Sequence, residues 1–289
     1  MTGGERGSVI VGVDDMSYSW LAADWAAAEA ESRGCGVKVV HAVGSGAEAA
    51  YGEAAGPGLT DEAAKAAAAV LDDAQARLAA AHPGVPIETG LARGDPAEAL
   101  INAAEDADVL VVGTRGRGGF AGLLLGSVSR KVAAHAHRPV VVVRGDTMNA
   151  ADRPVVAGVR DERDEEAVRF ALAEAELHGA GVRLVHAWRP LTVSGLMATQ
   201  VSHLDQERDA HAQLLNHAAR PVAEYPTVRV EIELTVDSPA AALVEASAEA
   251  GLVVLPRHPV EGRLGLPLGT VVHAVLHHAR CPVAVVPVG

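Results

Sequence analysis

The chain carries its sequence pattern twice, and this internal repeat limits the folds open to it more than any single motif does. Residues 9–43 (VIVGVDDMSYSWLAADWAAAEAESRGCGVKVVHAV) are mirrored by residues 155–188 (VVAGVRDERDEEAVRFALAEAELHGAGVRLVHAW). Near the end of each copy, RPVVVVR at 138–144 is mirrored by CPVAVVP at 281–287. A repeat of this kind indicates a tandem duplication, and 289 residues are enough for two domains of typical size.

Short, β-branched apolar runs alternate with helical segments in both copies. In the first copy we expect strands at 9–13, 37–42, 87–91, 109–112 and 140–143, and helices at 17–33, 59–81, 96–105 and 128–137. In the second copy we expect strands near 155–159, 182–187, 228–236, 252–255 and 283–287. This alternation is typical of a parallel sheet covered by helices on both faces.

The predicted fold class is therefore α/β, with two tandem doubly wound domains of five parallel strands each. We place the first domain at 1–144 and the second at 155–289. The intervening segment 145–154 (GDTMNAADRP) is polar and rich in turn-forming residues, so we interpret it as a linker.

A glycine-rich stretch follows the fourth expected strand of the first copy. Glycines recur from Gly113 to Gly126, so the backbone can take positive φ angles and approach a ligand closely. Ser127 is expected to cap the next helix, whose amides and dipole would favour a phosphate group. The basic side chains at hand to neutralise charge are Arg115, Arg117, Arg130 and Lys131. An ordinary strand-to-helix connection that binds nothing is the alternative interpretation.

An aspartate stands at the end of the first strand. In a doubly wound sheet a ligand lies beyond the carboxyl ends of the strands at the switch point, which would bring Asp14 and the Gly113 loop together. The carboxylate could accept hydrogen bonds from a ribose hydroxyl or a base amine. A helix-capping role is the alternative for Asp14. The loop is neither a Walker A motif, because it lacks Gly-Lys-Ser/Thr, nor a dinucleotide fingerprint, because its glycines are spaced differently.

The spacing of Gly113, Gly116 and Gly126-Ser127 resembles the G-2X-G-9X-G-(S/T) signature of the ATP-binding branch of the universal stress protein family. The resemblance extends over nearly the whole chain and implies an adenine nucleotide alpha hydrolase-like fold. It also implies a nucleotide-dependent stress-response regulator that binds ATP, with or without Mg²⁺, in the first domain. The nucleotide-binding residues so implied are Val13, Asp14, Ala42, Gly113, Arg115, Gly116, Arg117, Gly126, Ser127 and Val128.

Members of this family pair through their last strands, so the resemblance implies that Val140–Val143 pairs with Val283–Val286 within one molecule. Further association into a homodimer is an open expectation. The arginine-over-lysine, alanine-rich composition is associated with bacteria of high GC content.

The two copies differ where the chemistry is expected. Asp14 is matched by Arg160, Gly113 by Pro256 and Gly116 by Pro259, whereas Gly126-Ser127 persists as Gly269-Thr270. Proline fixes φ and removes an amide donor, so we expect the second domain to bind ATP weakly or not at all and to act as a partner for the first. A different anion, held by Arg160, Arg257 and the helix that begins at Thr270, is the alternative.

Composition narrows the remaining function classes. A formal net charge of −13 argues against general binding of nucleic acid or anionic membranes. The chain has two cysteines and shows neither a secretory signal nor an apolar run of ~20 residues, so we expect a cytoplasmic protein with reduced thiols.

Catalytic and metal-binding alternatives find less support in the sequence. His273, His277 and His278 lie on one expected helix without a nearby acidic residue, which favours a solvated helix face over a metal site. Structural roles are expected for His41 and His186, and no G-x-S-x-G elbow is present. A slow ATPase or a phosphoryl or adenylyl transferase remains open, as does a nucleotide-free scaffold, but efficient catalysis is not expected.

Overall fold

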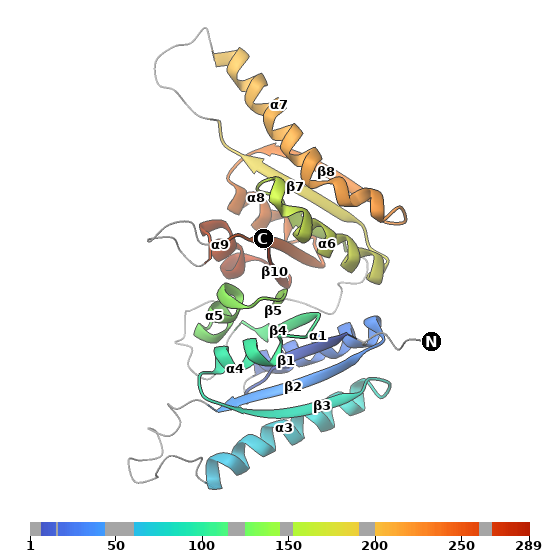
Figure 1. Cartoon of the computed structure of the whole chain (residues 1–289), viewed down its shortest axis with the longest axis vertical. Helices are drawn as coiled ribbons and strands as arrows, with labels where there is room; N and C mark the ends of the chain where they lie inside the picture. The colour runs from blue at the N-terminus through green and yellow to red at the C-terminus, as the bar shows by residue number, and fades with distance from the viewer. Residues whose placement is uncertain are drawn as a thin grey trace. The chain divides into compact units, whose positions relative to one another are not determined.

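The structure is a computed structural model that describes residues 7–15, 17–43, 61–114, 125–144, 153–190, 200–259 and 268–289 (Figure 1). The chain divides into two compact units, Met1–Thr147 and Met148–Gly289, called unit 1 and unit 2 below.

Unit 1 is a doubly wound α/β domain. Its described strands are β1 (Ser8–Gly12), β2 (Gly36–Val43), β3 (Ile87–Arg93), β4 (Val109–Gly113) and β5 (Val140–Val143). They pair in parallel in the order β3-β2-β1-β4-β5. The described helices are α1 (Ser17–Arg33), α3 (Asp61–Ala81), α4 (Pro96–Ala103) and α5 (Ser127–His135).

Unit 2 repeats this architecture. Its described strands are β6 (Val155–Gly158), β7 (Val182–Trp188), β8 (Val230–Val236), β9 (Leu252–Arg257) and β10 (Val283–Pro287), all parallel, in the order β8-β7-β6-β9-β10. Its described helices are α6 (Glu165–His178), α7 (Gln200–Ala218), α8 (Pro239–Ala246) and α9 (Thr270–His278), with the 3₁₀ turns η1 (Glu162–Asp164) and η2 (Arg220–Glu224). The same strand order in both units confirms the predicted fold class.

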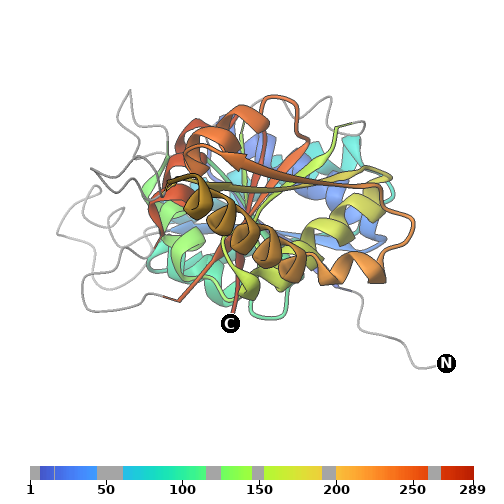
Figure 2. The same cartoon turned by 90° about the horizontal axis from the view of Figure 1, so that it is seen from above.

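Helices lie on both faces of each sheet. In unit 1, α1 packs with α3 and α4 packs with α5, as right-handed crossovers require for this strand order (Figure 1, and from above in Figure 2). Small side chains let these layers approach closely. Most buried residues of α1 are alanines, and the residues that it covers in the sheet are mostly valines. At Gly12 an added Cβ would lie 2.7 Å from Leu100 Cδ1, so this position of β1 has no room for a side chain.

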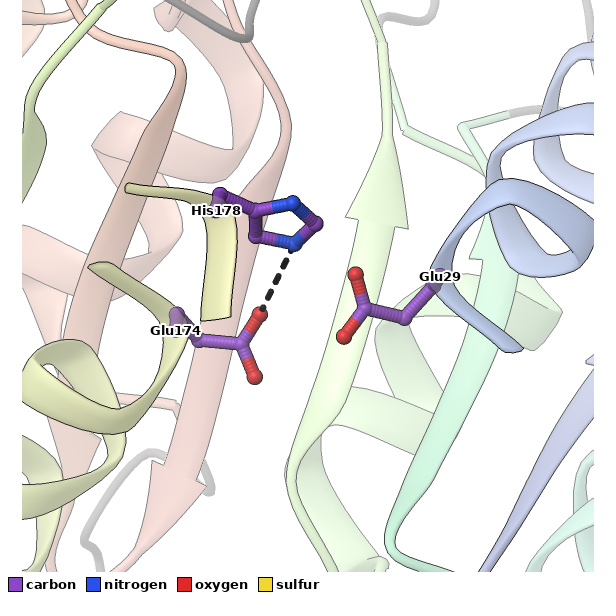
Figure 3. A group of neighbouring side chains, drawn as sticks. All are labelled: Glu29, Glu174 and His178. Carbon is purple, nitrogen blue, oxygen red and sulfur yellow. Dashed lines mark ion pairs between the residues drawn. The ribbon is translucent and has the colours of Figure 1, made fainter. Parts of the chain in front are cut away.

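Matched ion pairs mark equivalent helices of the two units. On α1 the buried Glu29 carboxylate accepts from Arg33 Nε at 2.6 Å, one turn later. On α6 the buried Glu174 carboxylate lies 3.9 Å from His178 Nε2, again one turn later (Figure 3). The helices then end at Gly34 and Gly179, both at φ 65°. These shared details support the duplication down to individual side chains.

Most element boundaries fall close to those predicted, with one instructive difference. The strand predicted at 252–255 extends through Pro256 to Arg257. Pro256 is tolerated because the ladder between β6 and β9 ends at the pair Ala157 and Val254. Beyond that point β9 pairs with β10 alone, so the proline's missing N–H deprives no second neighbour of a hydrogen bond.

Candidate functional site

The carboxyl ends of β1 and β4 lie side by side at the point where the strand order of unit 1 reverses. Val11 pairs with Val111, and two residues further along these strands come Val13 and Gly113. On the other side of β1, the Val13 amide donates to Val40 O at 2.9 Å. Asp14 and Ala42 follow at the same edge of the sheet, as the topology predicts.

Two hydrogen bonds fix the backbone around Asp14. His41 Nδ1 lies 2.8 Å from Val13 O, and because a carbonyl can only accept, Nδ1 carries the proton. Ser19 Oγ donates to Asp14 O at 2.7 Å. The Asp14 side chain itself is half-buried at this edge. The structural role expected for His41 is therefore to hold the segment that presents Asp14.

The two ends of the glycine-rich segment are tied together. Ser129 Oγ donates to Gly113 O at 2.6 Å, and Gly126 N donates to Thr114 O at 2.6 Å. The start of α5 is thereby fixed beside the end of β4. Arg115, Gly116 and Arg117 lie outside the described residues.

The expected capping role of Ser127 is wrong by one residue. Gly126 is the N-cap of α5, with φ −74° and ψ 159°, and Ser127 is the first helical residue. A glycine cap has no side-chain oxygen, so no side chain of the cap accepts from the amides of the first turn. Ser127 is exposed and Val128 half-buried, so these donors lie at an accessible helix terminus.

One of the expected basic residues is engaged elsewhere. Lys131 Nζ donates to Asp95 Oδ2 at 2.8 Å, and this hydrogen bond is the main reason that the pKa of Asp95 lies below its ordinary value. Asp95 also caps α4 by accepting from the amides of Ala97 and Glu98. The structure thus pairs Lys131 with a carboxylate, whereas Arg130 is exposed in the first turn of α5.

Unit 2 keeps the scaffold of this site. Val159 N donates to Val185 O at 2.9 Å, and His186 Nδ1 donates to Val159 O at 2.8 Å, as Val13 and His41 do in unit 1. Gly269 is the N-cap of α9, also without a side-chain hydrogen bond. Because Ala157 pairs with Val254, the strand register places Pro256 where unit 1 has Gly113.

The corresponding edge of unit 2 holds a cavity of about 370 Å³. Its polar and charged lining comes from the ends of three strands and the start of α9, namely Arg160, His186, Arg257, His258 and Thr270. Burial lowers the pKa of Arg257 below its ordinary value.

Sequence reasoning missed two side-chain groups in unit 2. In the first, His186 Nε2 accepts from His211 Nδ1 at 2.8 Å and Trp188 stacks on the His211 ring. Burial, and then the neighbouring His186, lowers the pKa of His211. The second group joins Asp164 of η1 to His258 just after β9. The three-residue spacing of Asp161 and Asp164 in the sequence could have indicated a capping box. The contact of Asp164 with His258 could not be predicted without knowing the fold.

The histidines on α9 form no larger ligand set among the residues that the structure describes. The ring centroids of His273 and His277 are 4.4 Å apart, and no third metal-binding side chain there joins them. Cys35 and Cys281 are both buried thiols. Within the same described residues, the helices are too short or too polar to cross a membrane.

Comparison with known proteins shows the family. The sequence profile of the "Universal stress protein family" matches residues 5–144 and again 153–287. A universal stress protein of Mycobacterium tuberculosis is 34% identical over 96% of this chain and 96% of its own, and one of Mycolicibacterium smegmatis is 31% identical over the same shares. The crystal structure of a universal stress protein from Archaeoglobus fulgidus covers 98% of this chain and 97% of its own, with a TM-score of 0.72 and 19% identity, and shares the fold. The chain therefore belongs to the universal stress protein family and carries its domain twice.

Proposed function

We propose that unit 1 binds ATP, with or without Mg²⁺, at the carboxyl edge of its sheet, and that the bound nucleotide controls a stress-response regulator. One observation carries this proposal. The G-2X-G-9X-G-(S/T) segment begins at Gly113 on β4, beside the end of β1 that bears Asp14. It ends at Gly126 and Ser127, the N-cap and first residue of α5. The domain limits that we propose are 1–144 and 155–289, with 145–154 as the linker.

The phosphate groups would lie at the start of α5. Its first-turn amides point away from the helix toward an anion, and the helix dipole adds a favourable field. Gly126 has no Cβ that would keep a phosphate at a distance, and the backbone of Ser127 and Val128 supplies donors. The glycine-rich loop would complete the phosphate site with Arg115, Gly116 and Arg117.

The nucleoside would lie across the ends of β1 and β2. The Asp14 carboxylate can accept from a ribose hydroxyl, and the backbone near Ala42 would contact the base. The Val13 amide donates to Val40 O and the Val13 carbonyl accepts from His41 Nδ1, so both backbone groups are already hydrogen-bonded. Val13 would therefore contact the nucleoside through its apolar side chain and fix the direction of the next residue, Asp14. The net charge of −13 opposes the approach of ATP, so affinity would depend on these local contacts.

Binding is a better account of this site than efficient catalysis. Phosphoryl transfer needs a positioned metal and a residue that orients the attacking group, and the acidic candidates that the sequence offers beside the site are Asp14 and Asp15. We therefore propose an output by population shift, in which ATP binds one conformation of the protein more tightly than another.

A matched pair of glycine variants tests the assignment. Gly126 and Gly269 are equivalent N-caps with nearly equal backbone angles that valine can adopt, so Gly126→Val and Gly269→Val should both fold. Titration calorimetry with ATP and Mg²⁺ should show no measurable binding to Gly126→Val and unchanged affinity for Gly269→Val. Unchanged affinity in Gly126→Val would contradict the phosphate site.

A further inference from the structure

Three metal-binding side chains converge in unit 2, beside the cavity described above. Asp161 is the N-cap of the 3₁₀ turn η1 after β6, Asp164 is the last residue of that turn, and His258 follows β9. Each offers one ligand atom, and these atoms lie within 4.8 Å of one another. The aligned residues of unit 1 are Asp15, Tyr18 and Arg115, so the group belongs to unit 2 alone.

Asp164 is a fully buried carboxylate with one oxygen left over. Its Oδ2 accepts from the amides of Arg160 at 2.5 Å and Asp161 at 3.0 Å, which fixes the direction of the side chain. Its Oδ1 makes no hydrogen bond within the described part of the chain. A buried carboxylate oxygen without a hydrogen bond is costly, so a partner at this position would be stabilising.

His258 supplies the second ligand atom. Its side chain is 7% exposed, and Nε2 lies 2.8 Å from Asp164 Oδ1. The two atoms are nevertheless not aligned as donor and acceptor, and neither ring nitrogen of His258 makes a hydrogen bond to any described residue. The two groups form an ion pair when the imidazole is protonated. Ligand atoms of one tetrahedral Zn²⁺ lie about 3.3 Å apart, because the Zn–N and Zn–O distances are about 2.0–2.1 Å, so a neutral His258 ring needs only a small shift to share an ion with Asp164.

Asp161 completes the group from the solvent side. Its side chain is 23% exposed, and its oxygens accept from Arg163 Nη2 at 3.0 Å and Arg163 N at 2.9 Å. Arg160 Nε also lies 3.8 Å from Asp161 Oδ2. The side chains of Arg163 and Arg160 are 45% and 62% exposed, so both can leave this oxygen without being buried elsewhere. With a neutral imidazole, the two carboxylates bring a charge that balances a divalent cation.

We propose that Asp161, Asp164 and His258 bind a divalent transition metal ion such as Zn²⁺ in unit 2. One imidazole nitrogen and two carboxylate oxygens suit Zn²⁺ or Mn²⁺ better than Mg²⁺, which prefers oxygen ligands. Three protein ligands leave a coordination position open. His258 also lines the cavity of unit 2, and so does Arg160, so that position is filled by water or a small anion from the cavity. This site is independent of ATP binding in unit 1.

Zinc titration of the full chain tests the proposal. The protein is stripped with a chelator and titrated with ZnCl₂ in the absence of nucleotide, with calorimetric detection. We expect one saturable Zn²⁺ per chain and a raised thermal midpoint. His258→Gln and Asp161→Asn should each weaken Zn²⁺ binding by at least about tenfold. Asp164 is left intact because its removal would expose the two amides that it accepts from.

A matched histidine variant separates this site from the histidine pair on α9. His273 and His277 are neighbouring histidines of unit 2 that belong to neither this group nor the His186–His211 pair, so His277→Gln is a control. It should leave Zn²⁺ affinity unchanged. The proposal is overturned if the wild-type chain shows no saturable site, or if His277→Gln abolishes binding while His258→Gln retains it. Circular dichroism of each variant ensures that lost binding is not lost folding.

Discussion

Units 1 and 2 share a scaffold and differ at the edge where a ligand would bind. In both, a histidine on the second strand holds the carbonyl of the residue after the first strand, and a glycine caps the helix after the fourth. Unit 1 adds Asp14 and Gly113 to this scaffold, whereas unit 2 has Arg160 and Pro256. The two units therefore share strand order and backbone hydrogen bonds, and the difference between them lies in the side chains at the carboxyl edge.

After the loss of ATP binding expected for Gly126→Val, the next largest effect concerns the carboxylate at the end of β1. Asp14→Ala removes a charged hydrogen-bond acceptor worth about 1.5–3 kcal/mol, so ATP affinity should fall by roughly 10- to 100-fold. Asp15→Ala is the matched control and should change affinity little. Calorimetry on both variants checks this, and equal losses would show that general charge, not a specific contact, is at work.

The reverse substitution tests whether a carboxylate at this position is sufficient for ATP binding in unit 2. Arg160→Asp restores the carboxylate in unit 2 but leaves Pro256, which has no amide to donate. No second ATP site should therefore appear. If the variant bound two nucleotides per chain, the carboxylate alone would decide the difference between the units.

An intermediate effect on stability is expected at two equivalent glycines, Gly12 at the end of β1 and Gly158 at the end of β6. A Cβ at Gly12 would meet one leucine, Leu100, whereas a Cβ at Gly158 would meet both Leu255, at 2.9 Å, and Leu243, at 3.0 Å. Gly12→Ala and Gly158→Ala should each lower the free energy of unfolding by about 1–3 kcal/mol through overpacking. The loss should be larger for Gly158→Ala because two buried side chains must move. Urea unfolding measures this, and a larger loss at Gly12 would contradict it.

The smallest effect concerns the caps of α4 and α8. Asp95→Ser gives α4 a serine N-cap like that of α8, where the Ser238 side chain makes no hydrogen bond to the helix. The substitution also removes the exposed ion pair between Asp95 and Lys131. We expect a loss of about 1 kcal/mol or less in the free energy of unfolding at neutral pH. Ser238→Ala should cost less still.

The pH dependence of this small effect has a definite sign. The pKa of Asp95 is lowered in the folded state, chiefly by the hydrogen bond from Lys131. The contribution of Asp95 to the free energy of unfolding is therefore complete above its pKa in the unfolded chain, about 3.9. It is lost as the pH falls through the lower pKa that Asp95 has in the folded protein. The difference between wild type and Asp95→Ser should be constant from pH 5 to 7 and shrink below about pH 4. A difference that grew on acidification would contradict the assignment.

Local sequence signals were sufficient for most of the fold. The helix at Ser17–Arg33 was predicted to the residue because Ser17 and Gly34 are clear start and stop signals. The meeting of Asp14 with the start of the Gly113 loop also followed, since strand order alone decides which carboxyl ends are neighbours.

The details that escaped prediction depend on tertiary contacts. Lys131 pairs with Asp95 from 36 residues away, and no local pattern connects them. The approach of His258 to Asp164 likewise needs the adjacency of β6 and β9. Gly126 in place of Ser127 as the cap is a difference of one residue, which local propensity cannot decide when both residue types are good caps.

The most direct test of the difference between the units is the number of ATP molecules bound per chain. Native mass spectrometry over a rising ATP concentration, with Mg²⁺ present, counts them directly. We expect one ATP per chain at saturation for the wild type and none for Gly126→Val. Two ATP per chain would contradict the proposed loss of binding in unit 2, and none at millimolar ATP would contradict the nucleotide site of unit 1.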